Sequence, residues 1–140
     1  MKILIAEDDT ISRFFLEKTL KKFGYAVTAC KDGSEAWEAY QQGDYPIVIS
    51  DWMMPEMDGL ELCRRIRATS RSASCYFMIV TARTSRCDFI EAMAIGADDY
   101  ITKPLDSDEI EVRLRMAERI LTGKRAQAAL LSRKEKGSYT

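Results

Sequence analysis

The sequence predicts a doubly wound α/β domain, written (βα)5, in which helices cover both faces of one five-stranded parallel sheet. Short apolar runs alternate five times with longer segments whose apolar residues recur near helical spacing. Each unit of run and segment has about the length that a right-handed strand–helix–strand crossover needs. In the central run, residues 47–49, every residue is apolar and no polar residue alternates with them. This is typical of a strand buried on both faces.

The expected strands are short, apolar and bounded by turn-forming residues. They cover residues 2–6, 25–29, 47–50, 76–80 and 99–102. The expected helices begin at polar caps and stop at glycines or small polar residues. They cover residues 10–23, 34–43, 59–67, about 85–95, and a long last segment after the caps at 106–108. In the fourth helix we expect Phe89, Ile90 and Met93 to face inward.

Several acidic residues follow strands that we expect to be neighbours. For a sheet of this kind we predict the strand order 2-1-3-4-5, common in flavodoxin-like folds, with the switch point between the first and third strands. Asp8 and Asp9 follow the first strand and Asp51 follows the third, so all three fall at one crevice. Taken alone, each has a plainer explanation as a turn or helix cap. Three neighbouring carboxylates need charge compensation, and Mg²⁺ is a cation that such ligands hold well.

A hydroxyl and an amine reach the same sheet edge. Thr81 ends the fourth strand and Lys103 follows the fifth. Alone, Thr81 would be read as a helix cap and Lys103 as a solvated surface residue. Together with the acids they supply a carboxylate nucleophile, a metal site, a cation and a hydrogen-bond donor. Those are the parts that phosphoryl transfer requires.

Composition limits the possible functions. The 140 residues suit one domain, and a net charge of -1 gives no reason to expect direct binding to nucleic acid or a membrane. The chain has no histidine, which excludes Ser-His-Asp and Cys-His catalysis within it. The N-terminus enters a strand without a signal peptide, and the four cysteines form no CxxC pair. We therefore expect a cytoplasmic protein with reduced thiols.

These motifs together resemble the receiver domain of two-component response regulators over residues 1–121. The resemblance is carried by Glu7-Asp8-Asp9, Asp51 to Gly59, Thr81-Ala82, Gly96 to Tyr100, and Lys103-Pro104. It implies a phosphorylation-dependent signalling switch, or phosphorelay component. Asp51 would take a phosphoryl group from a histidine kinase or a histidine phosphotransfer protein, and an output or dimerisation surface would change. Such a module is no enzyme toward other substrates, because it catalyses only its own phosphorylation and dephosphorylation.

The resemblance also implies a ligand set for Mg²⁺. Asp9 and Asp51 would bind the ion directly, together with the backbone carbonyl of Met53. Asp8 would act mainly through the waters of the ion.

A second group of roles concerns the phosphoryl group and its detection. The resemblance implies that Lys103 pairs with the phosphoryl oxygens and that Thr81 moves to donate to them. Tyr100 would rotate inward behind Thr81, although a plain core aromatic is the alternative. The family also suggests a cis peptide before Pro104, which an X-Pro bond permits at modest cost.

Two rival functions use different residues. An aspartyl-nucleophile phosphatase, the main alternative, usually has a second acid two residues after the nucleophile, where this chain has Met53. A flavin-binding module binds phosphate in its first loop, where Glu7-Asp8-Asp9 would repel it. Neither set of residue requirements fits this sequence.

Residues 122–140 are expected to form a helical extension or linker with a polar C-terminal tail. A heptad-like seam enters this segment through Ile110, Leu114, Ala117, Leu121, Lys124, Ala128 and Leu131. It suggests a dimer stalk or a link to a downstream effector domain. For its first half, an ordinary amphipathic helix packed on the sheet is the alternative. A homodimer could also form through the face made by 85–95, 99–102 and the last helix.

Overall fold

The computed structural model describes residues 1–137, apart from the side chains of Arg125, Ala128 and 132–137. Five strands form one sheet in this part of the chain. They are β1 (Lys2–Ala6), β2 (Ala26–Cys30), β3 (Ile47–Asp51), β4 (Tyr76–Thr81) and β5 (Asp99–Thr102). Their order is β2-β1-β3-β4-β5, and each neighbouring pair is parallel. The predicted strand order is confirmed, and every strand lies within one residue of its expected bounds.

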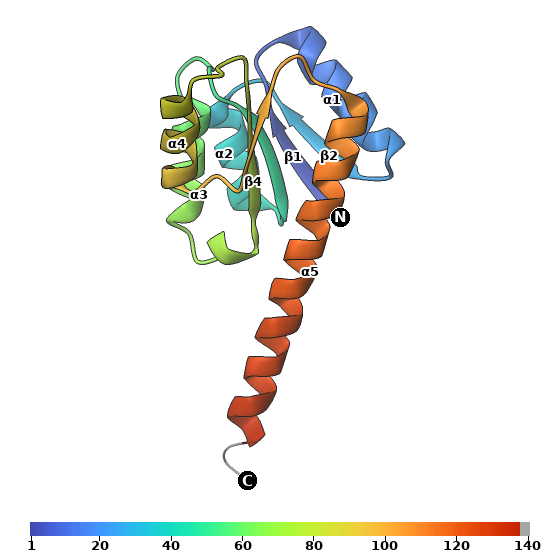
Figure 1. The fold of residues 1–140 in the computed structure, drawn as a ribbon, viewed down its shortest axis with the longest axis vertical. Coiled ribbons are helices and arrows are strands. Elements are labelled where there is room, and N and C mark those ends of the chain that lie inside the picture. Colours follow the sequence, from blue (N-terminus) through green and yellow to red (C-terminus); the bar gives the residue numbers. More distant parts are fainter. Residues whose placement is uncertain (138–140) are drawn as a thin grey trace.

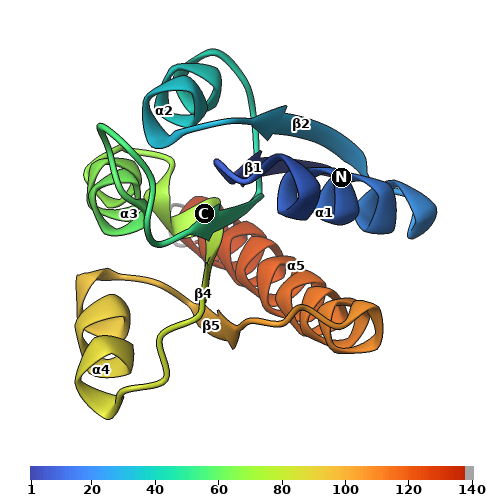
Figure 2. The same cartoon turned by 90° about the horizontal axis from the view of Figure 1, so that it is seen from above.

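Five α-helices in the described part of the chain cover the sheet (Figure 1). They are α1 (Thr10–Lys22), α2 (Gly33–Gln42), α3 (Gly59–Arg67), α4 (Arg86–Ile95) and α5 (Ser107–Gly137), with a short 3-10 turn at Ser72–Ser74. Seen from above, α1 and α5 lie on one face and α2, α3 and α4 on the other (Figure 2). Side-chain caps start α1 to α4 at Asp9, Asp32, Asp58 and Ser85.

The two faces of the sheet carry separate apolar cores because successive strand side chains point to opposite sides. Ile3 and Ile5 of β1 pack with residues of α1 and α5. Leu4 and Ala6, which alternate with them, pack with residues of α2, α3 and α4. Strands β3 and β4 are buried along their whole length, as their uninterrupted apolar sequences predicted.

The expected orientation of α4 is wrong for two of its three named residues, since only Met93 packs against the core. Phe89 is 45% exposed and Ile90 is 53% exposed, whereas Ala92 is fully buried. Apolar residues occupy most of this helix and lie on all its sides, so its pattern does not select a face. The small side chain of Ala92 permits a close approach to the sheet, and this leaves the larger side chains outside.

The last helix continues past Gly123 to Gly137 and projects from the domain (Figure 1). The first half of the predicted heptad seam is buried against the sheet, through Ile110, Leu114, Ala117 and Leu121. The ordinary amphipathic packing therefore holds for this half. Leu131 is exposed, and Ala128 lies outside the described side chains. Much of the segment expected to be a polar tail is helical, and 138–140 lie outside the described residues.

Within residues 1–137, none of the helices combines the length and apolar content that crossing a lipid bilayer requires.

Candidate functional site

Parallel strands bring four polar side chains to one edge of the sheet. Three of them are predicted site residues, and the fourth directly precedes Asp8. Asp51 ends β3 and Thr81 ends β4, while Glu7 and Lys103 directly follow β1 and β5. Asp51 lies opposite Val80 in the register of β3 and β4. The topology therefore places these residues at nearly the same level, although 96 positions separate Glu7 from Lys103 in the sequence.

The ammonium group of Lys103 joins two buried carboxylates. It donates to Glu7 Oε1 and to Asp51 Oδ2, each at 3.1 Å. Glu7 is 1% exposed and Asp51 is 9% exposed. Burial alone would lower the pKa of Lys103, but the hydrogen bonds to Asp51 and Glu7 outweigh this effect and raise it. Lys103 therefore stays protonated at neutral pH and supplies a fixed positive charge beside Asp51.

The pKa of Glu7 lies far from its ordinary value. Burial, followed by the hydrogen bond and the repulsion from Asp51, raises the pKa of Glu7 to about 8, and Lys103 only partly opposes this shift. The single charge of Lys103 is thus too small to stabilise both Glu7 and Asp51 in their ionised forms. The site has the electrostatic character of one that accepts further positive charge.

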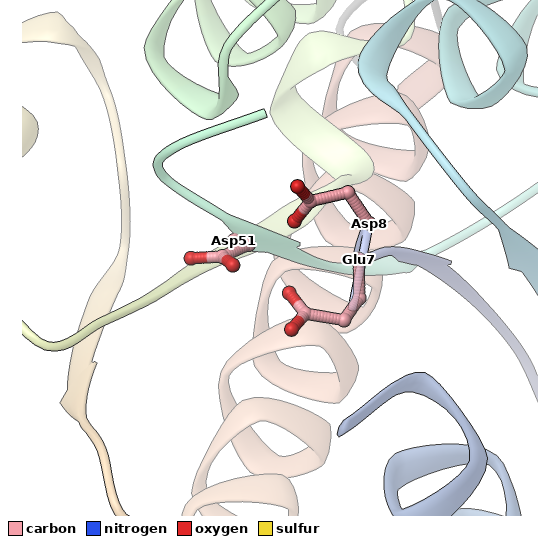
Figure 3. Close-up of side chains that lie close together, drawn as sticks. All are labelled: Glu7, Asp8 and Asp51. Carbon is pink, nitrogen blue, oxygen red and sulfur yellow. The ribbon is translucent and has the colours of Figure 1, made fainter. Parts of the chain in front are cut away.

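Three carboxylates converge beside Lys103. Glu7, Asp8 and Asp51 each offer one oxygen, and these oxygens lie within 4.8 Å of one another. Figure 3 shows them at the ends of β1 and β3, with Asp8 the exposed member. Hard oxygen donors of this kind suit Mg²⁺, which binds one or two protein carboxylates and keeps several waters. Both the donor set and the raised pKa of Glu7, which shows that one lysine does not offset the charge of all these carboxylates, fit such an ion.

Asp9 has a different place from the one predicted. Its Oδ2 accepts from the Ser12 N–H at 2.8 Å, which makes it the N-cap of α1. This backbone hydrogen bond is the main reason why the pKa of Asp9 is lowered. Asp9 thus caps α1 and lies outside the cluster of Glu7, Asp8 and Asp51, while its expected role as a direct ligand and that of Asp8 as an indirect one stay predictions.

Glu7, which was expected only as part of a motif, belongs to the cluster instead. A sequence signal for this arrangement existed. Glu7 directly follows a fully buried strand, whereas Asp9 stands where an aspartate caps the helix that begins at Thr10.

The two predicted switch residues both hydrogen-bond to Arg83. The Thr81 hydroxyl oxygen accepts from the Arg83 N–H at 3.1 Å, and the Tyr100 hydroxyl donates to the Arg83 carbonyl at 2.9 Å. The Tyr100 ring lies edge-on to Trp52 and to Phe89, at centroid distances of 6.3 and 5.5 Å. Burial raises the pKa of Tyr100, so its hydroxyl keeps the proton that it donates. Their switching roles stay predictions.

Backbone contacts hold the loop after β3 close to the nucleophile candidate. The Gly59 N–H donates to the Trp52 carbonyl at 2.8 Å. A Cβ on Gly59 would lie 2.2 Å from the Asp51 carbonyl oxygen, so glycine is required there. The side chain of Met53 is exposed, and the role of its carbonyl as a ligand stays a prediction. The Lys103–Pro104 peptide is cis, as the resemblance implied.

Replacing Glu7 by glutamine should stabilise the metal-free protein in a pH-dependent way. The ordinary pKa of 4.5 applies in the unfolded chain, whereas the folded value is about 8, so ionising Glu7 costs stability progressively as pH rises between these values. We expect Glu7→Gln to match wild type near pH 4 and to gain as much as about 5 kcal/mol in free energy of unfolding above pH 8. Urea denaturation in EDTA at both pH values measures this, and a gain that does not vary with pH would contradict it.

Comparison with known proteins places this geometry in a family. A family model described as the response regulator receiver domain matches residues 3–115. The transcriptional regulatory protein RprY of Bacteroides fragilis is 34% identical over 125 residues, which are 89% of this chain and 52% of that protein. The uncharacterized transcriptional regulatory protein YkoG of Bacillus subtilis is 38% identical over 115 residues, 82% of this chain and 50% of that protein. The chain thus spans about half the length of these curated relatives.

Solved structures of similar proteins have the same fold, and the match covers nearly the whole length of each of them. The chemotaxis response regulator CheY4 of Vibrio cholerae has a TM-score of 0.79 and 29% identity, covering 83% of this chain and 97% of that one. The receiver domain of sensor histidine kinase PA1611 from Pseudomonas aeruginosa has a TM-score of 0.76 and 27% identity, covering 86% and 97%. That structure has a magnesium ion coordinated in its active site cleft. On the sequence match and the fold together, this chain belongs to the response regulator receiver domain family.

Proposed function

We propose that this chain is a phosphorylation-dependent signalling switch in which Asp51 accepts the phosphoryl group. The observation that supports this most strongly is the Asp51 carboxylate, which is 9% exposed, ends β3 and has Lys103 at 3.1 Å. One Asp51 oxygen would attack phosphorus while the bond from phosphorus to the histidine nitrogen of the partner breaks. Lys103 would offset charge on the transferred oxygens, and Thr81 would donate to one of them.

Mg²⁺ is the cofactor that we propose for this site. Asp8 and Asp51 would hold it directly with the Met53 carbonyl, and Glu7 would act through its waters; this revises the expectation for Asp9. The ion would offset the charge of the phosphoryl oxygens during transfer. The support is the three-carboxylate cluster and the raised pKa of Glu7, together with the magnesium ion described for the Pseudomonas aeruginosa receiver.

The donor would be a histidine kinase or a histidine phosphotransfer protein, since this chain has no histidine of its own. We propose no reaction on other substrates. The phosphatase alternative lacks support, because the position two residues after Asp51 is the thioether of Met53 and offers no acid. The names of the curated relatives describe transcriptional regulators, so an effector downstream of α5 is the output that we propose.

A second copy of the chain is a further proposed partner. Val112, Met116 and Ile120 recur at intervals of four along α5 and are 58, 44 and 42% exposed. They form an outer stripe, distinct from the buried half of the predicted heptad seam. Phe89 and Ile90 of α4 are exposed as well. We propose that phosphorylation alters pairing through α5 or through the face formed by α4, β5 and α5.

Incubation with Mg²⁺ and acetyl phosphate tests the function directly. We expect the intact mass to rise by one phosphoryl group, with the label on Asp51, because its carboxylate is the one at the centre of the site. Asp51→Asn removes the nucleophile with little change in volume and should stay unlabelled. Equal labelling of the two proteins would disprove the assignment. Sedimentation of the labelled and unlabelled wild type tests the proposed change in pairing.

The choice between Asp8 and Asp9 as metal ligand has its own test. Mg²⁺ that binds only the folded state should raise the thermal unfolding midpoint. We expect Asp8→Asn to lose most of this rise and Asp9→Asn to keep it, since asparagine still caps α1. Thermal unfolding with and without millimolar Mg²⁺ measures both. If Asp9→Asn loses the rise while Asp8→Asn keeps it, the revised ligand set is wrong.

A further inference from the structure

The first two acids after β1 both face Asp51, although they are consecutive in the sequence. The carboxylate oxygens of Glu7, Asp8 and Asp51 lie within 4.8 Å of one another, and Figure 3 shows the first two side chains turned to the same side. In an extended strand, successive side chains point to opposite faces of the sheet. The backbone therefore leaves the strand conformation here, and contacts from outside β1 have to hold it in place.

The guanidinium group of Arg13 supplies such contacts. Arg13 is the fourth residue of α1, and its Nη1 donates to the Glu7 carbonyl at 2.8 Å and to the Asp8 carbonyl at 3.4 Å. The register of β1 with both neighbouring strands ends at Ala6, so these two carbonyls lie past the last paired residue. One partly buried side chain thus binds the backbone of both acids.

The place of Arg13 in α1 needs a local reason. The first turn of a helix favours anions, because the helix dipole is positive there. Arg13 lies at the end of that turn, and the turn has no acidic residue. The two carbonyl oxygens are the acceptors that offset this unfavourable placement. Through its charge alone, Arg13 would repel a metal ion rather than attract it.

We propose that Arg13 is a positioning residue for the Mg²⁺ site, which holds residues 7–9 so that the carboxylates of Glu7 and Asp8 face the ion. The inference rests on the proposed function, because the ion is the one proposed to assist phosphoryl transfer to Asp51. Side chains that orient a metal ligand without touching the metal typically change metal affinity about 10- to 100-fold when they are removed.

Three possible roles of Arg13 predict different effects on metal binding. If it acted only through its charge, its removal would tighten Mg²⁺ binding. If it only stabilised the fold, its removal would lower the thermal unfolding midpoint in EDTA and leave the Mg²⁺ dissociation constant of the folded protein unchanged. If it positions the ligands, its removal weakens Mg²⁺ binding.

The Mg²⁺ dissociation constant should be measured by calorimetry for wild type and for Arg13→Met. Methionine keeps much of the side-chain length but removes the charge and the donors. We expect the dissociation constant to rise about tenfold. Arg13→Lys keeps a cation that donates hydrogen bonds and should recover most of the affinity. Lys18→Met removes a charge from an exposed position on the same helix and should leave the constant unchanged.

An unchanged or lower dissociation constant in Arg13→Met would overturn the inference, and so would an equal rise in Lys18→Met. Arg13→Gln, which is too short to reach both carbonyls, replaces Arg13→Met if that variant does not fold, and the same rise is expected. If wild type binds Mg²⁺ but is not labelled by acetyl phosphate, the proposed function fails, while the same titration still decides the role of Arg13. A wild type that does not bind Mg²⁺ would contradict both.

Discussion

The hydrogen bonds from Lys103 to Glu7 and Asp51 are the interaction on which the site depends. They join the ends of β1, β3 and β5, and they hold two buried carboxylates close together around one ammonium group. The remaining excess of negative charge appears as the raised pKa of Glu7. The same cluster would therefore suit a divalent cation, and Lys103 would keep a positive charge where the oxygens of a transferred phosphoryl group would lie.

Much of this arrangement follows from the sequence because parallel topology fixes where strand ends meet. Uninterrupted apolar runs identified the buried strands, and the strand order then brought Asp51, Thr81 and Lys103 to one edge. The order of the three consecutive acids after β1 was harder to interpret. All three carry the same charge, and only the start of α1 decides that Asp9 caps the helix while Glu7 and Asp8 turn toward Asp51.

The helices show where pattern alone is insufficient. Apolar residues occupy most of α4, so no period selects its inner face, and the fit of Ala92 against the core decides it. In α5 the seam that predicted a dimer is largely the core of its own domain, and the exposed stripe of Val112, Met116 and Ile120 lies beside it. The contacts of Arg13 could not be predicted, since they depend on the conformation of its side chain.

The most direct measurement of the central claim is a titration with beryllofluoride, a mimic of the phosphoryl group, followed by Trp52 fluorescence in a Trp37→Phe background. Trp52 is adjacent to Asp51 and in contact with Arg83, so it should report occupation of the site. The account predicts a saturable change that requires Mg²⁺ and disappears in Asp51→Asn. A change of equal size in Asp51→Asn, or one that is independent of Mg²⁺, would contradict it.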